Sequence, residues 1–122
     1  VCLPHPFDGF GRYPLKTSDR EILVSHIDII EIFNARSIRG NFSAQARSYA
    51  EQHGFLCSAG SDSHSTREVG NAYVEMPAFD DSEGFKIALG KGQVFGRKNS
   101  VIDRVATGIS TLPKRIRGHR HV

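Results

Sequence analysis

The sequence has no long hydrophobic segment. Its apolar runs fall well short of the roughly 18 residues from which a transmembrane helix is built. Its first residues also lack the basic stretch that precedes the apolar part of a signal peptide. These absences argue against membrane and secreted proteins, and we expect a soluble, cytoplasmic protein. The 122 residues contain no internal repeat or low-complexity segment and suit a single domain with its own core.

Cysteine is scarce as well. The sequence has two cysteines, Cys2 and Cys57, and both lie in short apolar runs, where an unpaired cysteine behaves as a small hydrophobic residue. Two cysteines without a spacing motif give no disulfide framework. Disulfide formation or metal ligation is the alternative, but unpaired cysteines in a reducing cytoplasm fit the pattern better.

Positive charge is concentrated at the C-terminal end. Residues 97–122 contain seven Lys or Arg against one Asp, a net charge of +6, so residues 1–96 carry −3 of the overall +3. A basic tail of this kind is either a solvated segment or a surface for nucleic acid or anionic lipid. No aromatic residue follows Phe95 to stack on bases. We therefore divide the chain into a body, residues 1–96, and a basic tail, residues 97–122.

Strand-like and helix-like patterns alternate along the body, which predicts an α/β fold of parallel strands joined by crossover helices. The expected strands lie at residues 1–4, 28–33, 55–59, 72–76 and 93–95. The expected helices begin near Thr17 or Ser18, near Asn41 or Ser43, and at Asp80, Asp81 or Ser82, and end near His26, near Gly54, and near Gly90 or Gly92.

Polar side chains of the kinds that bind metals follow or end three of these strands. His5 follows the first strand, Glu31 and Asn34 lie at the end of the second, and Asp62 and His64 follow the third. In parallel α/β folds, the carboxyl ends of the strands are where active-site groups converge. The sequence thus predicts that these five residues gather at one end of the sheet.

The pair Asp62 and His64 carries the strongest chemical signal. In an extended segment, residues two apart project to the same side, so this carboxylate and this imidazole can reach one ion. Gly60 permits a backbone turn before them. Taken without its context, an Asp-x-His sequence is also compatible with an ordinary surface turn.

The other candidates have structural alternatives. His5 lies between two prolines that fix its direction, but it could equally be a surface or capping residue. Burying Glu31 in an apolar strand is costly without a cation or hydrogen-bond donors, and an ion pair with Arg36 or Arg39 would also satisfy it. Asn34 either binds a substrate oxygen or holds the turn.

The remaining histidines suit structural roles. His26 and His53 lie at expected helix ends, where a histidine is a favourable cap. His119 and His121 lie in the basic tail, and their His-x-His spacing is most simply a coincidence.

Four stretches together resemble one protein family, the polymerase and histidinol phosphatase (PHP) superfamily, in its C-terminal half and its PHP-associated segment. They are residues 4–7 (Pro-His-Pro-Phe), 29–34 (Ile-Ile-Glu-Ile-Phe-Asn), 60–64 (Gly-Ser-Asp-Ser-His) and 68–70 (Glu-Val-Gly). The resemblance extends to about Arg104. It implies an α/β fold that is the C-terminal part of a distorted (β/α)7 barrel. Members of this family are mostly phosphoesterases that hold two or three metal ions.

The resemblance implies roles for the candidate residues. His5, Asp62 and His64 would be metal ligands and so catalytic, and Glu31 and Asn34 would support the site or contact the substrate. Mixed imidazole and carboxylate ligands suit zinc, manganese or iron. A divalent ion lowers the pKa of a bound water, so the implied reaction is hydrolysis of a phosphate ester.

The chain departs from the family pattern in one respect. The His-x-His motif that opens the family's barrel is absent from the body. We therefore expect a fragment that lacks the N-terminal half of the barrel, is inactive by itself, and self-associates through unpaired sheet edges. The alternative is a non-catalytic, PHP-like accessory module whose basic tail binds nucleic acid or a partner protein.

Overall fold

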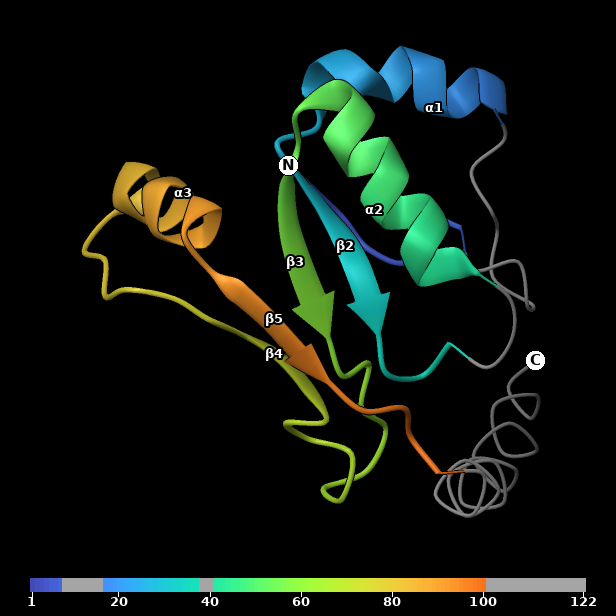
Figure 1. Cartoon of the computed structure of the whole chain (residues 1–122), viewed down its shortest axis with the longest axis vertical. Coiled ribbons are helices and arrows are strands. Elements are labelled where there is room, and N and C mark those ends of the chain that lie inside the picture. The colour runs from blue at the N-terminus through green and yellow to red at the C-terminus, as the bar shows by residue number, and fades with distance from the viewer. Residues whose placement is uncertain (8–16, 38–40, 101–122) are drawn as a thin grey trace, which may run out of the picture.

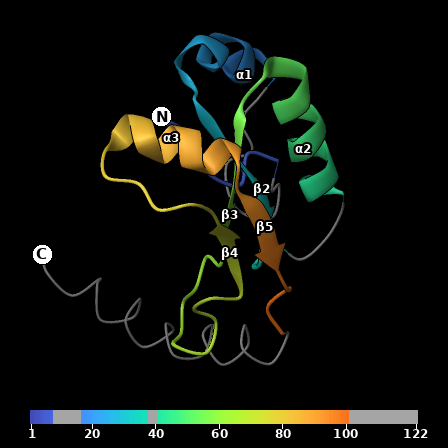
Figure 2. The same ribbon diagram turned by 60° about the vertical axis from the view of Figure 1, so that its left-hand side comes forward.

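The computed structural model describes residues 1–7, 17–37 and 41–100 (Figures 1 and 2). Its elements are, in order, β1 (Cys2–Leu3), α1 (Thr17–Leu23), η1 (Val24–His26), β2 (Ile29–Asn34), α2 (Phe42–His53), β3 (Leu56–Gly60), β4 (Ala72–Glu75), α3 (Ser82–Gly90) and β5 (Gln93–Gly96). They closely match the elements predicted from the sequence. No helix within these ranges has the length and apolar character needed to cross a lipid bilayer.

A three-stranded parallel sheet forms the centre of the fold. Its strand order is β1-β2-β3, which confirms the predicted parallel arrangement for this part of the chain. The side chains of Ile30 and Ile32 are 0% and 2% exposed and pack with Ala46 and Ala50 of α2 in the core. The pairing of β2 with β3 shifts register between Glu31 and Phe33. Such a bulge changes the direction in which the end of β2 presents its side chains.

Helix α2 covers one face of this sheet. It begins after Asn41 and ends at Gly54, whose φ of +71° is the left-handed conformation in which glycine commonly ends helices. Because the residues that face β2 include two alanines, Ala46 and Ala50, the helix can approach the strand closely. In Figure 2, α2 and α3 lie on opposite sides of β3.

The prediction of parallel strands throughout is wrong for β4 and β5, which pair antiparallel in a separate two-stranded sheet. A parallel crossover would require the helix between the strands to pack back along them. Instead α3, capped by the Asp81 side chain, lies beyond the end of the strand pair (Figure 1). A side chain at Gly92 would collide with Val74, so only glycine lets the chain return directly beside β4.

This return places two chain segments at one end of the molecule. Strands β2, β3 and β5 point toward the same end in Figure 1, while β4 runs the other way. The turn after β3 and the segment after β5 therefore meet there.

An ion pair joins α3 to the start of β2. Lys86 Nζ donates a hydrogen bond of 2.8 Å to Asp28 Oδ1. This hydrogen bond, together with one from the Val1 amino group, lowers the pKa of Asp28 from 3.8 to about 2. Since the folded-state pKa lies below the usual value, the ionised carboxylate favours folding above about pH 4, and this contribution is lost as the pH falls toward 2.

We predict that Lys86→Met raises the pKa of Asp28 toward 3.8, because it removes the first of these donors. The pKa is measured by NMR titration of the Asp28 carboxyl carbon. Lys91→Met, which removes an exposed lysine at the C-terminal end of α3, is the matched control and should leave the pKa of Asp28 unchanged. An Asp28 pKa equal in the two variants would contradict the assignment.

Candidate functional site

The structure brings the five predicted residues to the carboxyl ends of the parallel strands. His5 lies two residues beyond β1, Glu31 and Asn34 belong to β2, and Asp62 and His64 follow β3. His5, Glu31 and Asn34 also line one small pocket. These residues meet because the strands are parallel, so that each strand places its last residues at the same end of the sheet.

Glu31 is held by hydrogen-bond donors. Its Oε2 accepts from the backbone N–H of His5 at 2.7 Å and from Asn34 Nδ2 at 3.1 Å. A side chain at position 60 would collide with this carboxylate, so the glycine that ends β3 leaves room for it. These donors meet the cost of burying a carboxylate in the strand, and Arg36 pairs with a different acid. Arg39, the other predicted partner, lies outside the described residues.

Asn34 connects Glu31 of β2 with Asp62, which follows β3. Its Nδ2 lies 3.3 Å from Asp62 Oδ2 as well as contacting Glu31. Its Oδ1 accepts from the backbone N–H of Arg36 at 2.9 Å, so the same side chain also holds the turn after β2. Both sequence interpretations of Asn34, a site residue and a turn residue, are therefore compatible with its position.

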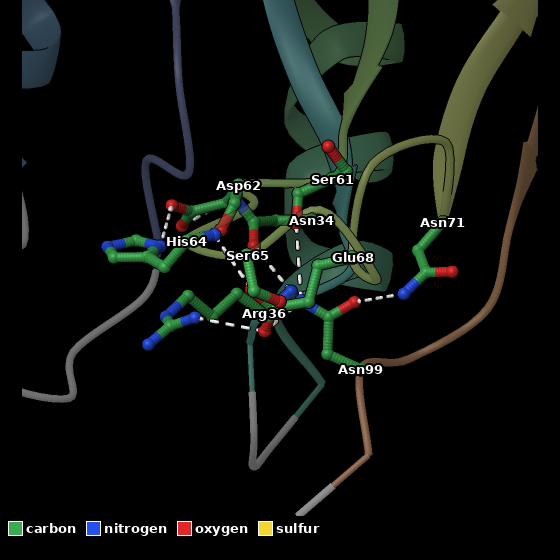
Figure 3. A network of polar contacts seen from close by, with 9 residues as sticks. All are labelled: Asn34, Arg36, Ser61, Asp62, His64, Ser65, Glu68, Asn71 and Asn99. Atoms are coloured by element: carbon green, nitrogen blue, oxygen red, sulfur yellow. Dashed lines mark hydrogen bonds and ion pairs between the residues drawn. The ribbon is translucent and has the colours of Figure 1, made fainter. Parts of the chain in front are cut away.

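Asp62 and His64 form a turn in which the imidazole is oriented by the backbone (Figure 3). His64 Nδ1 lies 3.0 Å from the carbonyl oxygen of Asp62 and 3.7 Å from its Oδ1. Since a carbonyl only accepts, Nδ1 carries the proton of this bond, and in the neutral ring Nε2 then holds the lone pair that can bind a metal. Asp62 has a φ of +47°, an uncommon conformation for a residue with a side chain, and His5 has a φ of +30°.

Beneath this turn lies a buried carboxylate that the sequence did not identify as part of the site. Glu68 is 0% exposed. It accepts hydrogen bonds from the backbone N–H of His64 (2.7 Å), Ser65 Oγ (3.3 Å), Arg36 Nη1 (3.2 Å) and Asn99 Nδ2 (3.2 Å) (Figure 3). Glu68 lies outside any strand or helix, so no periodic pattern indicates its burial. In the sequence, Glu68 stands out only as part of the stretch 68–70 that resembles the PHP superfamily.

The segment after β5 also reaches the site. Asn99 Nδ2 lies 3.4 Å from the carbonyl of Ser61, and Asn99 Oδ1 accepts from Asn71 Nδ2 at 2.7 Å. Lys98 Nζ donates to the carbonyl of Asn34 at 3.0 Å and lies 4.9 Å from the centre of the Phe33 ring. The first residues of the predicted basic tail thus pack on the body, and residues 101–122 lie outside the described part.

The donor set fits a metal in part. Imidazole nitrogen and carboxylate oxygen at Asp62 and His64 are ligands for zinc, manganese or iron. His5 contacts Glu31 through its backbone. Within residues 1–7, 17–37 and 41–100, no three His, Cys, Asp or Glu side chains are grouped closely enough to hold an ion. Asp62 and His64 alone therefore offer two ligand-type side chains.

The other histidines and the cysteines lie away from this set. His26 ends η1, and His53 ends α2 with its ring 4.4 Å from that of Tyr49 and 5.6 Å from that of Phe55, between centres. His119 and His121 lie outside the described residues. Cys2 is exposed and Cys57 is partly buried, both are free thiols in the described part of the chain, and burial raises the pKa of Cys57.

Comparison with known proteins identifies the segment that carries the turn. Residues 41–94, which include Asp62, His64 and Glu68, match the family model described as PHP-associated. The resemblance to the C-terminal part of the PHP superfamily is thereby confirmed.

One protein similar to the chain is the uncharacterized protein MJ0417 of Methanocaldococcus jannaschii. The two are 38% identical over 80 residues, which cover 62% of this chain and 33% of the relative. The chain thus spans about one third of the length of the relative it matches. No solved structure was found to match the chain.

We predict that Arg36→Met lowers the free energy of unfolding by roughly 3 kcal/mol, because it leaves the buried charge of Glu68 without its cation. Urea denaturation measures the change. The matched control is Arg67→Met, which removes an exposed arginine beside Glu68 and should change the free energy by no more than about 0.5 kcal/mol. Equal losses in the two variants would show that the Arg36 ion pair is unimportant.

Proposed function

We propose that the chain is part of a metal-dependent phosphoesterase of the PHP type, which hydrolyses a phosphate ester. Residues 1–96 would be the C-terminal portion of its metallo-hydrolase domain, and residues 97–122 a basic tail. The observation that carries the proposal is the turn after β3, where Asp62 and His64 lie together and the backbone directs the His64 proton to Nδ1. The PHP-associated match over the same residues supports it.

Each residue has a defined part in this proposal. Asp62, His64 and His5 would hold zinc, manganese or iron, with two or three ions in the complete site. Glu31 would fix the backbone of His5, and Asn34 would hold the Asp62 carboxylate in place, since these contacts exist in the fold. The bound ion would supply Lewis acidity and lower the pKa of a water molecule near the phosphate.

The rest of the ligand set would come from the N-terminal half of a distorted (β/α)7 barrel, of which β1, β2 and β3 would be three strands. The observation that this chain spans one third of a relative supports the idea that such a half exists. We propose that the chain alone is inactive for this reason.

Metal content of the chain tests the site. We predict that zinc, manganese or iron remains with the purified chain in elemental mass spectrometry, and that Asp62→Ala/His64→Ala reduces it to the level of the buffer. The matched control is Asp80→Ala/His26→Ala, which removes an exposed carboxylate and an exposed imidazole away from the turn and should keep the metal.

A longer form that includes the N-terminal half decides the function. It should bind metal and hydrolyse p-nitrophenyl phosphate, and both properties should be lost in Asp62→Ala/His64→Ala. A folded longer form without metal or hydrolysis would contradict the proposal and favour the accessory module that binds nucleic acid or a partner protein through its basic tail.

We also propose that the chain self-associates when the other half is absent. Strand β1 is at an edge of its sheet, and the stacked rings of Tyr73 and Phe95 are 49% and 40% exposed on β4 and β5. Open edges and exposed apolar surface favour association.

Sedimentation velocity should therefore detect dimers or larger species, and Tyr73→Ser/Phe95→Ser should shift them toward monomer. Phe79→Ser, which replaces a ring of similar exposure in the loop before α3, is the control and should have less effect. A monomeric parent chain would contradict self-association.

A further inference from the structure

Glu68 has no role in the proposed hydrolysis, yet it is the fully buried acid directly beneath the turn. We infer that Glu68 is a positioning residue: its carboxylate holds the turn of residues 61–65 from inside the fold and thereby sets the direction of the His64 imidazole. The inference rests on the proposed function only where it concerns metal binding.

The contacts with the turn itself are the first support. The hydrogen bond from the His64 backbone N–H to Glu68 Oε2 is 2.7 Å long, in the short range typical of bonds to ionised acceptors. Ser65 Oγ donates to the same oxygen at 3.3 Å. These bonds fix the backbone on the C-terminal side of Asp62, whose left-handed φ of +47° needs support from its surroundings.

The other oxygen of Glu68 faces the rest of the molecule. Arg36 Nη1, after β2, and Asn99 Nδ2, after β5, both donate to Oε1 at 3.2 Å. Asn99 Nδ2 also lies near the carbonyl of Ser61, at the start of the same turn. Glu68 therefore ties the turn to two segments that are remote in the sequence.

The direction of the imidazole depends on this arrangement. The bond from His64 Nδ1 to the carbonyl of Asp62 exists because the backbone from Asp62 to His64 folds back on itself. If the His64 N–H lost its acceptor, the turn would be free to open and this bond would break. The ring would then no longer be confined to the tautomer with its proton on Nδ1.

Glu68→Gln is a sharp test because all four partners of this carboxylate are donors. Glutamine has nearly the same shape, but its NH₂ group must face donors on one side. The change removes acceptor capacity with almost no change in volume. Ala50→Gly, which destabilises the buried face of α2 away from the turn, is a control for general loss of stability.

The measurement is NMR of the chain. In the parent, ¹⁵N shifts of the neutral His64 ring should report the proton on Nδ1. In Glu68→Gln, we expect loss of that tautomer and exchange of the His64 amide roughly tenfold faster or more, as a lost hydrogen bond to a charged group implies. Asn99→Ala removes one donor and keeps the ionised acid, so it should change the His64 tautomer and the His64 amide exchange rate in the same direction but less than Glu68→Gln does. It replaces Glu68→Gln as the test if that variant does not fold.

Two results would overturn the inference. One is an unchanged His64 tautomer and amide exchange rate in Glu68→Gln. The other is an equal change in Ala50→Gly, since the effect would then come from general destabilisation.

Metal content of the same samples separates this inference from the proposed function. If the parent retains metal, Glu68→Gln should retain less of it than Ala50→Gly does, and equal retention would overturn the link between Glu68 and metal binding. The parent chain and its longer form could both bind no metal while Glu68→Gln still loses the tautomer with the His64 proton on Nδ1. In that case the positioning role stands and the proposed metal function fails.

Discussion

A carboxylate buried without contact with solvent is the constraint on which this end of the molecule depends. Moving an ionised acid out of water costs several kcal/mol unless donors replace the lost solvent. Glu68 meets that cost with a cation, a side-chain amide, a hydroxyl and a backbone N–H. Since Arg36 and Asn99 come from segments remote from the turn, those segments must be in place before the acid can be buried.

The topology of the two sheets supplies these donors. Parallel pairing brings the ends of β2 and β3 together, which places Arg36 beside the segment that follows β3. The antiparallel return of β5 along β4 then brings Asn99 to the same end. It is β4 that runs opposite to the predicted direction, and because β5 pairs antiparallel with β4, β5 points the same way as β2 and β3 and delivers Asn99 to Glu68.

Much of the fold follows from local signals in the sequence. Gly54 ends α2 and Asp81 caps α3, as their residue types indicate, and the apolar run that contains Ile30 forms the central strand. His5, Glu31 and Asp62 lie at the same end of the sheet because each follows a strand or lies near its carboxyl end. Local signals suffice here because each depends on the residue's own conformation or on alternation along one segment.

Other features depend on contacts between distant residues, which single-sequence patterns do not encode. Alternation of strands and helices does not show that β4 and β5 pair antiparallel, and the close approach of Gly92 to Val74 exists only in the folded chain. The sequence makes Arg36 a possible partner for the nearby Glu31, but in the fold Arg36 pairs with Glu68, 32 positions away. The burial of Glu68 has no local signature because its neighbours Arg67 and Val69 are exposed.

The separation between Glu68 and its donors also bears on when the turn acquires its shape. The contacts with Arg36 and Asn99 close loops of 32 and 31 residues on either side of it in the sequence. Closing such loops costs entropy before the contacts form, and the contacts offset this cost only when the surrounding strands are already in place. A peptide containing residues 60–68 would have the complete Asp-x-His motif but neither remote donor. The motif is a property of three consecutive residues, whereas its geometry belongs to the whole folded chain.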